Sequence, residues 1–137
     1  MEQQLIILFS LVFFIMFIYS GIDKIINYKK KVQSLKEKIN VSDILLNTGM
    51  ICVILLEVFA PLIIIMRLFI GEKSPKILKL LSTVMFGLLI LFMIVVTLIY
   101  HPPSTNKMIP FLSNCTTFAG IIFLFILSNS ELINKKN

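Results

Sequence analysis

The chain is poor in charged residues and in the side chains that build metal and nucleotide sites. Charged residues make up 15% of its 137 residues, and it contains one His, two Cys and no Trp. Neither a nucleotide-binding signature nor a Cys-x-x-Cys pair occurs. Zinc and haem normally draw several ligands of suitable type. We therefore expect no metal site and no resident nucleotide cofactor.

Apolar residues are correspondingly abundant. They account for 58% of the chain, and the mean hydropathy is +0.97. A soluble domain carries about 25% charged residues, and a chain this short has too much surface to hide such an excess inside itself. The composition therefore predicts a protein that is solvated by lipid.

The apolar residues fall into four long runs, in which Glu57 is the one charged residue. A helix needs about 20 apolar residues to cross a bilayer, and its backbone must satisfy its own hydrogen bonds there. We predict an all-α, four-helix transmembrane bundle forming a single membrane domain over residues 1–137. The predicted spans are 5–22, 44–66, 80–100 and 108–130. Because no basic residue precedes the first run and no cleavage site follows it, we expect that helix to be retained.

The lysine-rich segment 23–43 joins the first two spans. Its apolar residues recur at roughly a helical period, which favours an amphipathic continuation of the first helix that lies along the membrane surface with its lysines toward the headgroups. A solvated loop is the alternative. Ser42 and Asp43 are suited to cap the second span, Pro75 is suited to begin the third, and the prolines after His101 should end it.

The basic residues flank the spans on both sides in nearly equal numbers. The positive-inside rule therefore decides little, and we expect the first link to be cytosolic from its density of lysines. Lysines beside membrane spans usually face lipid headgroups. The bilayer is the expected partner, and nucleic acid is not, despite the net charge of +6.

Polar residues concentrate at the helix ends near the first and third links. They include Ser20, Lys24, Asn47, Cys52, Tyr100, His101 and Asn114. Polar side chains in lipid usually face the bundle interior or a watery cavity, so this half favours a polar pocket. Residence at headgroup depth is the alternative, and it would explain Tyr19 and Tyr100 without a pocket.

Glu57 lies near the middle of the second span. An isolated carboxylate there is expensive, so it should be neutral or paired. No neighbour on its own helix face can neutralise it, and we expect its partner to be Lys24, His101, Asn114 or a hydroxyl. It could carry protons, bind a polar head or join neighbouring helices structurally.

Four other residues are assigned mainly structural roles. Arg67 lies roughly 15 Å of helix rise beyond Glu57, near the opposite boundary, where its side chain should extend toward water. His101 should make an interfacial hydrogen bond, although proton relay is open to it. Cys52 and Cys115 could form a redox pair, but as free thiols they would behave as small apolar side chains.

The order of short motifs resembles that of the DoxX family of small four-helix membrane proteins. The motifs are Ser20-Gly21-x-x-Lys24, Leu56-Glu57-Val58-Phe59-Ala60-Pro61, Met66-Arg67, His101-Pro102, and Asn114 followed by Gly120. This chain departs from the family pattern in its longer lysine-rich first link and fewer glycines. The resemblance assigns Lys24, Glu57, His101 and Asn114 to a polar, ligand-binding pocket. The resemblance implies either association with membrane redox complexes or a role as a cargo or maturation factor. The family takes its name from its association with a thiosulfate:quinone oxidoreductase.

Three functions follow as hypotheses. The first is an accessory or assembly subunit of a membrane redox complex, with a pocket for a small lipid-like ligand or quinone. The second is a catalytic quinone-linked oxidoreductase subunit in which Glu57 and His101 transfer protons. The third is a small ion or proton transporter with Glu57 as the ion site. Because the opposite half is nearly apolar, a continuous path would require a homo-oligomer.

Overall fold

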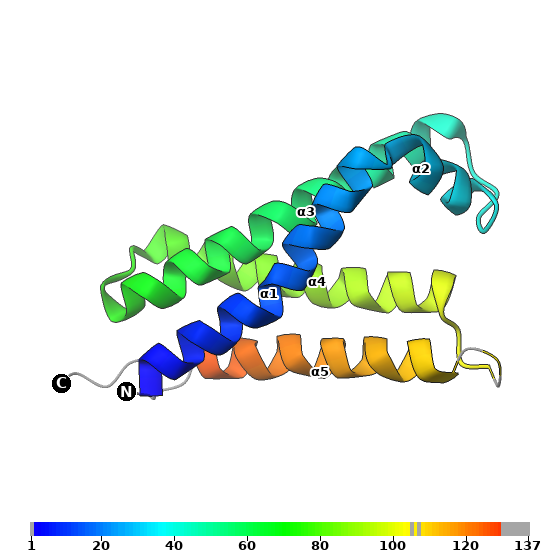
Figure 1. Cartoon of the computed structure of the whole chain (residues 1–137). Helices are drawn as coiled ribbons and strands as arrows, with labels where there is room; N and C mark the ends of the chain where they lie inside the picture. Colours follow the sequence, from blue (N-terminus) through cyan, green and yellow to red (C-terminus); the bar gives the residue numbers. More distant parts are fainter. Residues whose placement is uncertain (1, 105, 107, 130–137) are drawn as a thin grey trace.

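The computed structural model describes residues 2–104, 106 and 108–129, and within these the regular structure is helical (Figure 1). The elements are α1 (Glu2–Ile26), α2 (Tyr28–Lys36), α3 (Asp43–Ile70), the short 3₁₀ helix η1 (Gly71–Lys73), α4 (Lys76–Tyr100) and α5 (Met108–Asn129). The predicted all-α, four-helix architecture is confirmed.

Four helices are long and apolar enough to cross a membrane. The candidate spans are Gln4–Ile26, Asp43–Ile70, Lys76–Tyr100 and Met108–Asn129. The chain is therefore an integral membrane protein with several passes. The first three helices extend beyond the predicted apolar runs because charged and polar residues at their ends remain helical. The predicted end of the fourth span, residue 130, lies outside the described residues.

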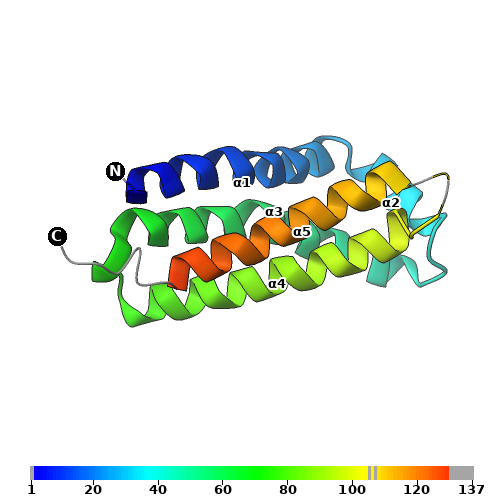
Figure 2. The same ribbon diagram turned by 90° about the horizontal axis from the view of Figure 1, so that it is seen from below.

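The helices pack in the order α1, α3, α4 and α5. Figures 1 and 2 show α1 beside α3 and α4 beside α5, with α2 at one end of the molecule and η1 at the other. In Figure 1, α1 and α5 diverge toward the α2 end. The bundle therefore opens toward α2.

Most of segment 23–43 is helical, as the amphipathic pattern predicted, but it is not continuous with α1. The helix breaks at Asn27, and α2 follows. The hydroxyl of Tyr28 donates to Oδ1 of Asn47 at 3.0 Å, which holds α2 against α3. Lys31 and Asp23 form an ion pair of 2.6 Å across the break.

Ser42 and the prolines lie at the predicted helix boundaries, and Gly71 marks a further one. Ser42 caps α3, because its hydroxyl accepts a hydrogen bond from the Leu45 N–H at 3.4 Å. Gly71 ends α3 in a backbone conformation with φ of 64°, which glycine adopts readily. Pro75 directly precedes α4, and α4 ends at His101 and the prolines that follow.

The solid core occupies the half of the bundle away from α2. The Phe14 ring lies 6.4 Å from that of Phe86, which lies 5.5 Å from that of Phe125. The buried cluster is Phe14, Phe17, Ala60, Ile64, Leu68, Phe86, Leu89, Met93, Ile121 and Leu124. Many outer apolar side chains are exposed on the bundle surface, as expected of residues that face lipid.

Arg67 does not extend outward, and the prediction that it would is wrong. Its side chain is buried, and its guanidinium donates to Oγ of Ser82 at 3.1 Å, to the carbonyl of Ser128 at 3.0 Å and to Oδ1 of Asn129 at 3.0 Å. The five donors of arginine can satisfy several acceptors at once, and the carbonyls at the end of α5 carry partial negative charge. Arg67 thereby joins α3 to α4 and α5.

Candidate functional site

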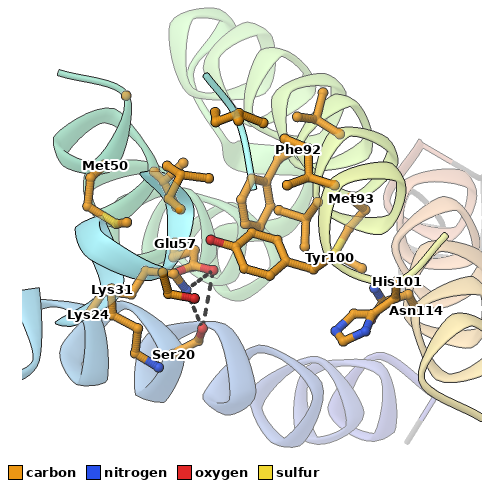
Figure 3. A pocket seen from close by; sticks show the side chains of 18 of the residues that line it. Ser20, Lys24, Lys31, Met50, Glu57, Phe92, Met93, Tyr100, His101 and Asn114 are labelled. Atoms are coloured by element: carbon orange, nitrogen blue, oxygen red, sulfur yellow. Dashed lines mark hydrogen bonds and ion pairs between the residues drawn. The ribbon is translucent and has the colours of Figure 1, made fainter. Parts of the chain in front are cut away.

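A cavity of about 640 Å³ lies in the half of the bundle nearer α2. Its lining includes all four residues predicted for the polar pocket: Lys24, Glu57, His101 and Asn114. Figure 3 shows Lys24 and Glu57 on one side and His101 and Asn114 on the other, with Tyr100 between them. The structure thus brings the four residues to one cavity, from α1, α3, the end of α4, and α5. Their role in binding a ligand stays a prediction.

Glu57 is paired with Lys24. The Lys24 amine lies 2.7 Å from one carboxylate oxygen and 2.9 Å from the other. The Ser20 hydroxyl donates to Glu57 at 3.3 Å and accepts from Lys24 at 2.7 Å. Glu57 is 3% exposed and Lys24 19%, so the pair is largely buried, and both residues line the cavity. Of the expected partners, Lys24 and a hydroxyl are the ones that contact Glu57.

Gly21 allows α1 to approach α3 closely enough for this pair to form. A Cβ atom added to Gly21 would lie 2.8 Å from Cγ2 of Val58 and 3.3 Å from Cβ of Glu57. Both distances are shorter than ordinary van der Waals contact. Gly21 therefore positions Lys24 against Glu57. The sequence does show a glycine one turn before Lys24. The hydrophobic pattern does not reveal which neighbouring helix that glycine contacts.

His101 and Asn114 form the opposite wall. The backbone N–H of His101 donates to the Thr97 carbonyl at 2.9 Å, which ends α4, and its ring lies 6.4 Å from that of Tyr100. The predicted hydrogen bond of the His101 side chain is not formed with any described residue. Nδ2 of Asn114 is buried and has no hydrogen-bond partner among the described residues.

The segment between α1 and α3 forms the end wall of the cavity. Lys31 and Leu35 of α2, with Ile39 and other residues of the following loop, line this end. The Lys38 amine lies 5.1 Å from the centre of the Tyr100 ring, a cation–π distance, so the loop contacts the end of α4. Tyr100, one of the polar residues on which the predicted pocket was based, lines the cavity, although residence at headgroup depth was the alternative for it.

Several polar residues of the same half lie away from the cavity. Cys52 and Cys115 are free and exposed, so no redox pair is formed. Thr116 is exposed, and its hydroxyl donates to the Leu112 carbonyl of its own helix at 3.0 Å. Across the described residues, His, Cys, Asp and Glu side chains form no group of three suited to a metal ion. Polarity alone thus predicted the correct half of the bundle but not which residues face inward.

The remaining lining is largely apolar. It includes Phe17, Met50, Val53, Phe92, Met93 and Ile99. Cavities of about 300–1,000 Å³ with apolar walls and a few placed polar groups are typical of small-molecule sites. This arrangement can hold a molecule with an apolar body and a polar head.

No family model, curated protein or solved structure matches the chain.

Proposed function

We propose that this protein is a membrane-embedded binding protein that holds a small amphipathic, lipid-like molecule in the cavity between its helices. The observation that carries the proposal is the apolar cavity of about 640 Å³, which has Lys24 and Glu57 on one wall and His101 and Asn114 on the other. A bundle that needed only to anchor itself in lipid could close this space with apolar side chains, as its other half does.

The resemblance to the DoxX family supports a specific setting for this binding. In that setting the protein is an accessory or assembly subunit of a membrane redox complex, and a quinone is a candidate ligand. Partner subunits, or a second copy of the chain, would contact the outer apolar helix faces. This part of the proposal rests on the sequence motifs, whereas the binding of an amphipathic molecule rests on the cavity.

A catalytic quinone-linked oxidoreductase subunit is the second candidate, because Glu57 and His101 both line the cavity. In that function they would exchange protons with a bound quinone. The pairing of Glu57 with Lys24 favours the binding role, since it gives the carboxylate a stabilising partner. An ion path has less support, because phenylalanine and aliphatic side chains fill the half near η1.

Two glycines provide a matched test. Gly49 lines the cavity, and a Cβ atom there would meet nothing within 4 Å, so leucine at this position should fill cavity space without a clash. Gly87 is equally open, but it is exposed and does not line the cavity. Each protein is purified in mild detergent, and its co-purifying small molecules are quantified by mass spectrometry.

We expect an amphipathic molecule to accompany the wild type and Gly87→Leu and to be depleted in Gly49→Leu. Equal retention by all three proteins would contradict the proposed binding function. Quinone reduction by the wild-type protein, lost in Glu57→Gln while the ligand is retained, would instead favour the catalytic candidate.

A further inference from the structure

The charged groups that line the cavity are already compensated. Lys24 pairs with Glu57 at 2.7 Å, and Lys31 pairs with Asp23 at 2.6 Å. Tyr100 and His101 are the other titratable residues in the lining. A ligand with an ionic head would have to break one of these pairs or remain uncompensated in an apolar surrounding, which is costly. The lining therefore favours an uncharged head.

Asn114 adds a requirement for hydrogen bonding. Its Nδ2 atom is buried without a partner among the described residues, and the residue lines the cavity. A buried donor left unpaired costs about 1–3 kcal/mol, so most such groups in proteins find an acceptor. An acceptor oxygen on a ligand head would satisfy this amide. The hydroxyl of Thr117 also lines the cavity but does not accept from Asn114, and its own hydrogen goes to the Ser113 carbonyl at 3.1 Å.

The cavity is lined by residues of both α1 and α5, the two helices that diverge toward the α2 end. Phe13 of α1 lies directly against Gly120 of α5, where an added Cβ atom would come within 2.6 Å of the ring. From there α1 and α5 separate toward the α2 end (Figure 1), and Ser20 of α1 and Ser113 of α5 both line the cavity. The α2 segment covers the end of the cavity. A ligand that enters between α1 and α5 comes from the lipid phase.

From these three observations, and resting on the proposed binding function, we infer that the ligand is an uncharged, bilayer-soluble molecule whose head presents an acceptor oxygen to the amide of Asn114. Quinone carbonyls and ester carbonyls share this chemistry. Both offer acceptors without carrying a charge or an N–H donor.

The test uses amphiphiles that share a ten-carbon chain and differ in the head. Decylbenzoquinone and decyl acetate are uncharged acceptors, decyl phosphate is an anion, and decyltrimethylammonium is a cation without an acceptor. Binding of each is measured to the protein in nanodiscs. Empty nanodiscs of the same lipid measure the partition of each probe into the bilayer, and Gly49→Leu tests whether the bound probe occupies the cavity.

We expect at least one uncharged probe to bind the wild type above this baseline and more tightly than either ionic probe. Tighter binding of decylbenzoquinone would indicate a quinone ligand, and tighter binding of decyl acetate would indicate an ester ligand. Asn114→Leu, which removes the donor at similar size, should weaken that binding about tenfold, equivalent to one hydrogen bond. Thr117→Val should stay within about twofold of wild type, because it removes no donor that faces the ligand.

Tighter binding of an ionic probe, or unchanged binding by Asn114→Leu, would overturn this inference. If no decyl probe exceeds the baseline while Gly49→Leu still loses the natural co-purifying molecule, the inferred head chemistry is wrong and the proposed binding function stands. Retention of that molecule by Gly49→Leu would remove the proposed function itself.

Discussion

Gly21 of α1 lies directly against Glu57 of α3, and the adjacent Val58 leaves too little space for a methyl group at Gly21. A Cβ atom on Gly21 would lie 3.3 Å from Cβ of Glu57 and 2.8 Å from Cγ2 of Val58. The residue that brings the two helices together thus contacts the residue that carries the buried negative charge. The contact between Gly21 and Glu57 therefore belongs both to the packing of α1 on α3 and to the surroundings of the Lys24–Glu57 pair.

Gly21→Ala should therefore loosen both the packing and the ion pair. Overpacking in a close contact costs about 1–3 kcal/mol, and we expect the free energy of unfolding in detergent to fall by about that amount. Gly87→Ala is the matched control, because a Cβ atom there meets nothing within 4 Å. Equal stability of the two variants would show that α1 can move away from α3 at little cost.

The Lys24–Glu57 pair should contribute to stability chiefly by preventing an uncompensated buried charge. Removing one partner of a buried pair costs about 3–5 kcal/mol, and the partial exposure of Lys24 places Lys24→Met at the lower end. The double variant Lys24→Met/Glu57→Leu should be more stable than Lys24→Met alone, because no charge is left unpaired. Thermal unfolding of the single and double variants measures this coupling.

Lys36→Met provides the control for that comparison. Lys36 pairs with Asp43 at 2.6 Å, but both side chains are exposed, and exposed pairs contribute about 0–1 kcal/mol. A double variant less stable than Lys24→Met would mean that Glu57 is stabilised by groups other than Lys24.

The fold was predictable from the sequence because lipid imposes a simple rule. A segment must be long, apolar and helical to cross the bilayer, so run length alone identified four helices. The ends were less predictable, because polar residues can remain helical where they find partners. Lys24 illustrates this: it lies within the predicted link 23–43, but α1 continues to Ile26, and the Lys24 amine pairs with Glu57.

The site was predictable in part. A charge at mid-span must be compensated, and that requirement pointed from Glu57 to a short set of partners that included Lys24. The role of Arg67 was missed, because it depends on which way the side chain turns near a helix end. Helical periodicity identifies a face of a helix, but not the neighbouring helix that will cover it.

The two ends of the bundle should be accessible from opposite sides of the membrane. Lys30 of α2 and Lys73 of η1 are both exposed and lie at opposite ends. In a protein with Cys52 and Cys115 replaced by Ser, we introduce a single cysteine as Lys30→Cys or as Lys73→Cys. Sealed vesicles that contain each variant are labelled with a membrane-impermeant maleimide. One variant should label before permeabilisation and the other only afterwards, and we expect Lys30→Cys on the cytosolic side. Labelling of both from one side would contradict four membrane passes.

Arg67 should stabilise the end of the bundle remote from the cavity. Its forked guanidinium donates to Ser82 of α4 and to Ser128 and Asn129 of α5. Lysine retains the charge but cannot match this geometry. Hydrogen bonds to charged groups contribute about 1.5–3 kcal/mol, so Arg67→Lys should lower the free energy of unfolding by about 2 kcal/mol.

The same variant also tests whether the two halves of the bundle act independently. Lys73→Ala, an exposed change at the same end, should be neutral in stability. The co-purifying molecule should be retained at the wild-type level in Arg67→Lys, since Arg67 does not line the cavity. Loss of that molecule from an otherwise stable Arg67→Lys protein would show that the Arg67 contacts and the cavity are energetically coupled through the phenylalanine core between them.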